Sequence, residues 1–153
     1  MQKINTEPLR FLILFLKKND ATQNHIIKSM KNKKHTVVVL GASSNPDRYS
    51  NKAIKMLIAY GHDVIPIHPA LKEIEGLPVV PSLAAVDTKV DTLTIYVGPQ
   101  KSKTLINEII SLSPGRVILN PGTESFELEH GLSQNKIPFI KGCTLVMLQT
   151  EQF

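Results

Sequence analysis

The sequence predicts an α/β domain of three layers, in which helices cover both faces of a parallel sheet of about five strands. Two observations lead to this prediction. From His35 onward, short runs rich in β-branched residues alternate with stretches of helical periodicity, which is the pattern of successive strand–helix–strand units. The first run, Thr36–Leu40, has no polar side, as expected for a strand that is buried on both faces. The chain of 153 residues has the size of one such domain.

The predicted strands are short apolar runs bounded by turn-forming residues. In chain order, the parallel strands are Thr36–Leu40, Asp63–Ile67, Asp91–Val97, Val117–Leu119 and Ile137–Ile140. A short edge strand is also expected at Gly76–Val80, where Pro78 limits the pairing of its backbone.

Helices are predicted in the intervals between the strands. Asn51–Tyr60 has an apolar face and stops at Gly61. The other predicted helices are a short one at Ser82–Ala85, one after Gly98-Pro99 with Leu105, Ile106, Ile109 and Ile110, and one with Phe126, Leu128 and Leu132. Thr144–Leu148 fits either a final strand or a helical turn. This order of elements predicts a Rossmann-like domain.

The basic charge of the chain is concentrated near its N-terminus. The formal net charge is +5, yet residues 1–36 hold eight basic and two acidic residues, and the remainder holds ten basic and eleven acidic residues. A nucleic-acid partner is therefore not expected for the domain. We interpret residues 1–32 as a basic N-terminal extension that the folded domain does not need, and residues 33–153 as the domain. Attraction of this extension to an anionic membrane or to RNA is a weaker alternative.

An apolar run, LRFLILFL at Leu9–Leu16, lies within the basic extension. It is much shorter than the roughly 20 residues of a transmembrane helix, so no transmembrane segment is expected. Lys17 and Lys18 follow the run where a secretory signal would carry small residues, so a secretory signal is not favoured. The run could instead form a short amphipathic helix. A chain beginning at Met30 is expected to keep its melting temperature and ligand affinity.

The turn after the first strand predicts a phosphate-binding loop. Gly41-Ala42-Ser43-Ser44 follows the strand directly, and small residues there let a phosphate approach backbone N–H groups near the next helix. The hydroxyls of Ser43 and Ser44 add donors, and Arg48 adds a cation that binds phosphate bidentately. The alternative is an ordinary strand-to-helix turn with a polar cap.

The same region argues against two common nucleotide sites. The loop has a single glycine, Gly41, so the G-x-G-x-x-G pattern of dinucleotide sites is absent, and no G-K-[ST] sequence of a P-loop is present. The second strand ends at Pro66-Ile67-His68 with no acidic residue for a ribose 2′-OH. His68 could face a ligand or simply cap its loop.

The motifs resemble the stand-alone CoA-binding domains, which are similar to the N-terminal domain of the succinyl-CoA synthetase α subunit. The resemblance rests on GASSNPDRYS, GHDVIPIHP, EIEGLPVVPSL, VDTLTIYVGP, VILNPGTES and GCTLVML, in order over about Lys33–Leu148. It implies a coenzyme A or acyl-CoA ligand. The departures are Ile118 and Asn120, which replace an aromatic residue and a glutamine of many relatives, so ring stacking there is not carried over.

The resemblance also implies a set of site residues. Gly41, Ala42, Ser43 and Arg48 would hold the phosphates. The adenine and ribose would lie by Pro66 and His68, and the pantetheine or diphosphate would pass Val97, Gly98 and Pro99. Asn120 and Gly122 belong to the turn that replaces the glutamine-containing one. The second domain and partner subunit of the synthetase are missing from this chain, so ligase activity is not carried over, although a protein partner or a homodimer stays open.

No catalytic group and no metal site is predicted. The five histidines lack metal-ligand spacing, and Cys143, the single cysteine, allows no intramolecular disulfide, which suits a reducing, cytoplasmic setting. The first hypothesis is therefore a small single-domain protein that binds CoA and is not expected to be an enzyme. The alternative is an NAD(P)-linked oxidoreductase or a CoA-dependent transferase on the same scaffold, using Cys143 or His68.

Overall fold

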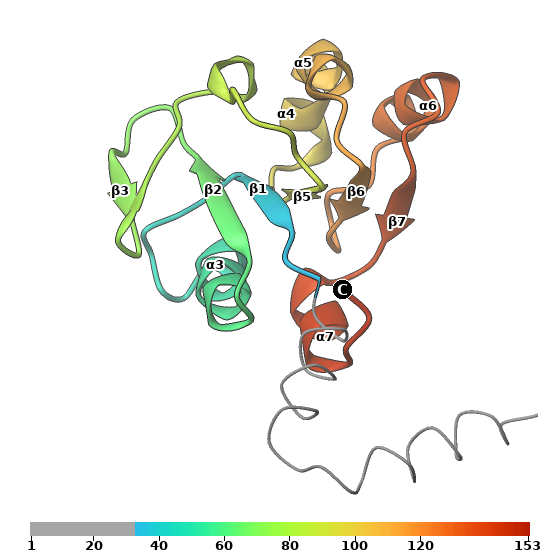
Figure 1. The fold of residues 1–153 in the computed structure, drawn as a ribbon. Coiled ribbons are helices and arrows are strands. Elements are labelled where there is room, and N and C mark those ends of the chain that lie inside the picture. The colour runs from blue at the N-terminus through green and yellow to red at the C-terminus, as the bar shows by residue number, and fades with distance from the viewer. Residues whose placement is uncertain (1–32) are drawn as a thin grey trace, which may run out of the picture. The chain divides into compact units, whose positions relative to one another are not determined.

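The computed structural model describes residues 33–153, and the basic extension with its apolar run lies outside the described residues. The described part contains a sheet of five parallel strands in the order β2-β1-β5-β6-β7 (Figure 1). The strands are β1 (Thr36–Leu40), β2 (Asp63–Ile67), β5 (Thr92–Ile95), β6 (Arg116–Leu119) and β7 (Phe139–Lys141). The predicted five-stranded parallel sheet is confirmed.

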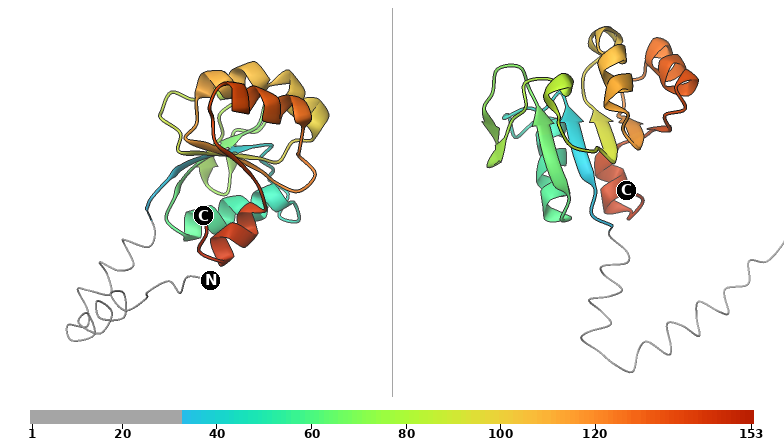
Figure 2. Two further views of the ribbon diagram at one scale, coloured as in Figure 1. Left: turned by 90° about the vertical axis from the view of Figure 1, so that its right-hand side faces the viewer. Right: turned by 45° about the horizontal axis from the view of Figure 1, so that its top comes forward.

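Helices cover both faces of the sheet, which confirms the three layers. Figure 2 shows α3 (Tyr49–Ala59) and α7 (Thr144–Gln149) on one face. The other face carries α4 (Pro99–Thr104), α5 (Ile106–Leu112) and α6 (Phe126–Gln134). The short 3₁₀ helix η1 (Leu83–Ala85) packs against α5. Within residues 33–153, no helix has the length and apolar character needed to cross a membrane.

The central strand β1 explains why its sequence has no polar side. Val38 and Leu40 belong to the apolar cluster beneath α5 and α6, whereas Val37 and Val39 belong to the cluster beneath α3 and α7. Successive side chains of a strand point to opposite faces, so a strand between two helical layers must be apolar throughout. At most 4% of any of these four side chains is exposed.

The segment after β2 differs from the predicted edge strand at Gly76–Val80. It forms an antiparallel hairpin of β3 (Glu73–Ile74) and β4 (Leu77–Pro78), and Val80 makes only an isolated bridge to Ile67 of the main sheet. Both central residues of its turn, Glu75 and Gly76, have positive φ, as in the type I′ turns that suit two-residue hairpins.

Two further elements depart from the sequence expectations. The predicted helix after Pro99 is divided at Leu105, whose N–H donates to the carbonyl of Ser102, three residues earlier. In α6, Leu128 and Leu132 are buried, but Phe126 is 80% exposed and stacks on His130. The C-terminal segment, for which the sequence left two options, is helical as α7.

The strand order fixes where a ligand cleft opens. The chain passes from β1 to β2 on one side and later returns to place β5 on the other side of β1. In open parallel sheets, ligands bind beyond the carboxyl ends of the two strands at such a reversal. The turns after β1 and β5 are therefore the first place to look for a site.

Candidate functional site

A cleft of about 650 Å³ opens at the carboxyl ends of the strands. Its walls come from the turns after β1, β2, β5 and β6, from the first turn of α3, and from η1, α4 and α5. A volume of this size is typical of sites for small molecules and cofactors.

Gly41 forms the floor of the cleft where β1 ends. Its φ is +87°, and a Cβ atom at this position would lie 2.9 Å from Cγ1 of Val97 and 3.0 Å from the carbonyl carbon of Tyr96. The positive φ and the close approach of β5 both require glycine. The backbone of the loop can therefore lie directly against the end of β5.

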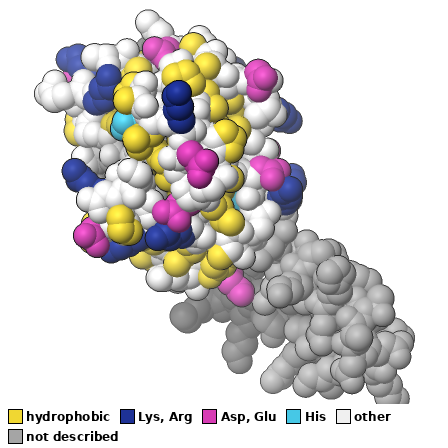
Figure 3. All heavy atoms as spheres, turned by 90° about the vertical axis from the view of Figure 1, so that its left-hand side faces the viewer, with side chains coloured by type: hydrophobic (Ala, Val, Ile, Leu, Met, Phe, Trp, Pro, Cys, Tyr) yellow, Lys and Arg dark blue, Asp and Glu magenta, His cyan; other side chains and the backbone are white. Residues whose placement is uncertain are grey.

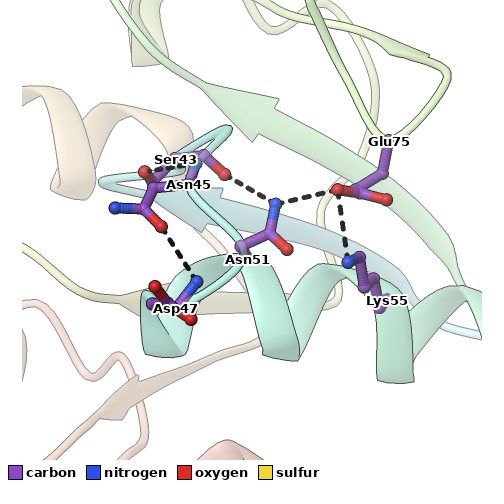
Figure 4. Close-up of polar contacts among 6 residues, drawn as sticks. All are labelled: Ser43, Asn45, Asp47, Asn51, Lys55 and Glu75. Atoms are coloured by element: carbon purple, nitrogen blue, oxygen red, sulfur yellow. Dashed lines mark hydrogen bonds and ion pairs between the residues drawn. The ribbon is translucent and has the colours of Figure 1, made fainter.

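The loop between Gly41 and α3 is held by short-range hydrogen bonds (Figure 4). The N–H of Asn45 donates to Oγ of Ser43 at 3.1 Å, and the N–H of Asp47 donates to Oδ1 of Asn45 at 2.9 Å. The N–H of Arg48 donates to the carbonyl of Asn45 at 3.1 Å. Side-chain turns of this kind fix a loop without strands or helices.

Asn51 ties this loop to the rest of the fold (Figure 4). Its fully buried amide Nδ2 donates to the carbonyl of Ser43 at 2.9 Å and to Oε1 of Glu75 at 3.0 Å. The same oxygen of Glu75 lies 3.7 Å from Nζ of Lys55. Through Asn51, the β3–β4 turn and α3 thus fix the position of the Ser43 carbonyl.

Several donors at the end of this loop have no protein partner among residues 33–153. The N–H of Ala42 is used by the carbonyl of Ile67, at 3.2 Å, but those of Ser43 and Ser44 are not engaged. Helix α3 has no side-chain cap at Arg48 and no acidic residue in its first turn, so its first N–H groups are also open. Arg48 makes no ion pair with another described residue. The combination of open N–H groups and one cation is suited to an anion.

His68 stands on the β2 side of the cleft with a defined hydrogen-bond pattern. The N–H groups of Ala70 and Leu71 both donate to its Nδ1, at 3.1 and 3.0 Å. A neutral ring that accepts at Nδ1 carries its hydrogen on Nε2. His68 therefore caps its own loop and leaves one N–H donor for a ligand.

Tyr96 lines the cleft at the end of β5. Burial raises the pKa of its hydroxyl to about 12, while the neighbouring hydroxyls of Thr144 and Thr94 act in the opposite direction. Those two threonine hydroxyls lie 2.7 Å apart and hydrogen-bond each other, and Oη of Tyr96 has no partner in hydrogen-bond geometry. The ring therefore serves as an uncharged wall at neutral pH.

The α4–α5 segment presents one continuous face to the cleft. Lys101, Leu105 and Glu108 line it at spacings of four and three residues, which is the repeat of a helix face. Neither Lys101 nor Glu108 makes an ion pair with another residue of the described part.

The structure brings together half of the twelve residues predicted for the site. Gly41, Ala42, Ser43, Arg48, His68 and Val97 line the cleft. Ser44, Pro66, Gly98, Pro99, Asn120 and Gly122 do not line it.

Five of the residues outside the cleft have evident structural positions. Pro66 is buried within β2, and Gly98 and Pro99 begin α4. Asn120 is 3% exposed: its Nδ2 donates to Oγ1 of Thr94 and to the carbonyl of Ile95, and its Oδ1 accepts from the N–H of Thr144. The N–H of Gly122 donates to Glu124.

Sequence reasoning missed the wall formed by Tyr96, Leu83, Lys101, Leu105 and Glu108. The spacing of Lys101, Leu105 and Glu108 could have predicted their place in the wall, because the helix after a strand turns one face toward the end of that strand. Leu83 gave no such signal, since η1 reaches the cleft through a long-range contact with α5.

Of the two groups considered for chemistry, His68 lines the cleft and Cys143 does not. Cys143 is a half-buried free thiol that begins α7 and does not line the cleft. Among residues 33–153, no three His, Cys, Asp or Glu side chains are grouped so that they could hold a metal ion.

Comparisons with known proteins agree with this architecture. A structure of a protein described only as uncharacterized is 40% identical, with a TM-score of 0.74, over 80% of this chain and 100% of that one. The structure of cell-free ID.343 from Thermus thermophilus is 27% identical, with a TM-score of 0.73, over 85% of this chain and 98% of that one. The dinucleotide-forming acetyl-coenzyme A synthetase 1 of Ca. Korarchaeum cryptofilum shares the fold, at 23% identity and a TM-score of 0.63, over 76% of this chain and 27% of the synthetase.

Sequence comparison adds a curated relative and a family. YneT of Bacillus subtilis is 30% identical over 70 residues, which are 46% of this chain and 52% of YneT, so the match spans about half the length of that relative. The family model described as CoA binding domain matches residues 35–149, which is nearly all of the described part. The chain therefore belongs to the family of CoA-binding domains.

Proposed function

We propose that the protein binds coenzyme A or an acyl-CoA in the cleft and holds the diphosphate at the Gly41–Ser44 loop. The observation that carries this proposal is the open N-terminus of α3 beside that loop. Its first N–H groups, the N–H groups of Ser43 and Ser44, and the guanidinium of Arg48 are all without protein partners among residues 33–153. Backbone donors at a helix N-terminus bind phosphate groups well.

The direction of the ligand follows from the two sides of the cleft. On the β2 side, Nε2–H of His68 and the exposed Pro69 suit the adenine and its ribose, with one hydrogen bond and one apolar surface. On the β5 side, Val97 and Leu105 give an apolar path for the pantetheine arm. The diphosphate then lies between them, over Gly41.

A nicotinamide dinucleotide suits this cleft less well. The missing glycines near Gly41 leave less backbone exposed to a second nucleotide, and β2 ends in Ile67 and His68 with no carboxylate for a ribose 2′-OH. The family of the chain favours CoA over the oxidoreductase alternative.

We further propose that the domain acts as a binding module without catalytic machinery of its own. His68 could serve as a base only through Nε2, and the tautomer needed would place a hydrogen on Nδ1 and break the hydrogen bonds from Ala70 and Leu71. Cys143 lies outside the cleft lining, so it does not face the bound thioester as a nucleophile would. A cytoplasmic setting is part of this proposal, supported by the free thiol of Cys143.

The test is an equilibrium titration with CoA of the wild-type protein, Arg48→Ala and Lys52→Ala. Arg48→Ala is expected to bind CoA at least about tenfold more weakly than the wild-type protein, because it loses a charge-assisted contact to the phosphates. Lys52→Ala removes the same charge one turn later on α3. The side chain of Lys52 lies over the Tyr49 ring and does not line the cleft, so this variant should bind CoA like the wild type. Wild-type protein that shows no saturable binding of CoA would contradict the proposal, as would equal effects of the two variants.

A further inference from the structure

A second cavity of about 370 Å³ lies between η1 and α5. Leu83 and Glu108 line both this cavity and the main cleft. Because Leu83 of η1 and Glu108 of α5 line both, the second cavity adjoins the cleft. The two elements that form its walls pack against each other and lie side by side at the top of Figure 1.

The α4–α5 face described above runs on into this second cavity. Leu105 and Glu108 line the cleft, and Glu108 and Leu112 line the cavity, at spacings of three and four residues along one face. A helix rises about 1.5 Å per residue, so the wall continues from Glu108 to Leu112 for about 6 Å beyond the pantetheine side of the cleft.

The lining of the second cavity combines apolar side chains with one carboxylate and two uncharged polar side chains. Leu83 is 2% exposed, Val86 and Leu112 are half-buried, and Ala84 on the η1 side is exposed. Asn107 and Ser111 supply uncharged polar groups. Glu108 is the one ionisable residue of this lining, is half-buried, and has no ion-pair partner among residues 33–153.

We propose that this cavity is an acyl subsite, which holds a short, uncharged acyl chain of a CoA thioester. The proposal rests on the proposed function, because the diphosphate at Gly41 and the pantetheine along Val97 bring the thioester toward Leu105 and Glu108. An apolar chain beyond that point is removed from water by Leu83, Val86 and Leu112.

Glu108 lies where the cleft meets the acyl subsite, and its charge makes the subsite prefer uncharged acyl groups to anionic ones. Its carboxylate can accept a hydrogen bond from an amide N–H of the pantetheine arm. The same carboxylate repels an acyl group that ends in a carboxylate of its own, since like charges in a partly buried site interact strongly. The subsite is therefore expected to prefer hexanoyl-CoA to CoA and to disfavour succinyl-CoA.

The experiment compares the affinities of CoA, hexanoyl-CoA and succinyl-CoA for the wild-type protein and two variants of η1. Wild-type protein should bind hexanoyl-CoA about tenfold more tightly than CoA, which corresponds to burial of about two methylene groups. Ala84→Phe fills the subsite and should remove this gain while leaving CoA affinity unchanged. Ala85→Phe is the matched control, because Ala85 is exposed like Ala84 but does not line the subsite, and it should keep the gain.

Glu108→Gln tests the charge preference separately. It should raise the affinity for succinyl-CoA relative to hexanoyl-CoA by several-fold, because the repulsion between two carboxylates is removed. Equal affinities of wild-type protein for CoA and hexanoyl-CoA would overturn the acyl subsite while leaving CoA binding intact, and so would equal effects of Ala84→Phe and Ala85→Phe. Failure of all three ligands to bind would overturn the proposed function and this inference with it.

Discussion

Gly41 and Val97 approach each other so closely that a Cβ atom on Gly41 would lie 2.9 Å from Cγ1 of Val97. These residues follow the ends of β1 and β5, the two strands at which the order of the sheet reverses. Their close packing lets the Gly41–Ser44 loop form the floor of the cleft. The stability of the domain and the shape of its ligand site therefore depend on the same glycine.

Gly41→Ala should lower the free energy of unfolding by about 2 kcal/mol more than Gly61→Ala does. Both glycines have positive φ, +87° and +85°, so both variants carry the strain of an L-residue in the left-handed region. Only Gly41 adds a clash, since no heavy atom lies within 4 Å of a Cβ built on Gly61. Urea unfolding measures both values, and equal losses would mean that the approach to Val97 is easily relieved.

Asn120→Ala should lower the free energy of unfolding by about 2 to 4 kcal/mol, because it leaves the buried N–H of Thr144 and the carbonyl of Ile95 unpaired. The amide of Asn120 joins β5, β6 and the start of α7. Asn135→Ala is the control, since that exposed amide makes one hydrogen bond, to the carbonyl of Gly131, and its loss should cost less than about 1 kcal/mol. A cost for Asn120→Ala as small as that of the control would contradict this role.

Protonation of His62 should make the domain less stable as the pH falls below 6.5. Burial lowers the pKa of His62, with further lowering by His35 and Arg116 and a smaller opposing effect of Asp63. Its Nδ1 also accepts the backbone N–H of His35, at 3.1 Å, which an imidazolium could not do. Because the unfolded chain takes up the proton more readily, the contribution of His62 is complete above pH 6.5 and is lost as the pH falls toward its folded pKa.

Melting temperatures between pH 8 and pH 5 test this dependence. The wild-type protein should lose more stability across this range than His62→Gln, which has no titrating ring. Parallel curves for the two proteins would show that other groups cause the acid sensitivity.

Removal of residues 1–32 should leave the melting temperature and the CoA affinity unchanged. Residues 34–153 form a compact unit by their contacts, and the described residues that line the cleft run from Leu40 to Thr123. Thermal melting and titration of a shortened chain that begins at Lys33 measure both quantities. A large loss of melting temperature or of CoA affinity would contradict this prediction and show that the domain needs the basic extension.

The strands could be predicted from the sequence because their signals are local. Thr36–Leu40 and Asp63–Ile67 have the bounds that the apolar runs predict. The division of the helix at Leu105 could not be predicted, since Leu105 continues an apolar periodicity and its break is visible only in the bond to Ser102. Phe126 fits the apolar face of α6 in sequence but is exposed, because it begins the helix beyond the edge of the core.

The candidate site was predictable where it depends on one turn. Gly41, Ser43 and Arg48 lie within eight residues and all line the cleft. The resemblance predicts Asn120 as a site residue, and its side-chain amide is engaged by Thr94 and Thr144, residues far away in the sequence. Side-chain direction after a strand depends on which distant element packs there, and one sequence does not contain that information.

An amide-resolved NMR titration with CoA shows directly whether the diphosphate binds at the Gly41–Ser44 loop, because it reports on each backbone N–H group. Saturable changes are expected to be largest at the N–H groups of Ser43, Ser44, Tyr49 and Ser50, around the open end of α3. At a CoA concentration that half-saturates the wild-type protein, these changes should be several-fold smaller in Arg48→Ala. Saturation by CoA with these four amides unmoved, or no saturation at all, would contradict the account.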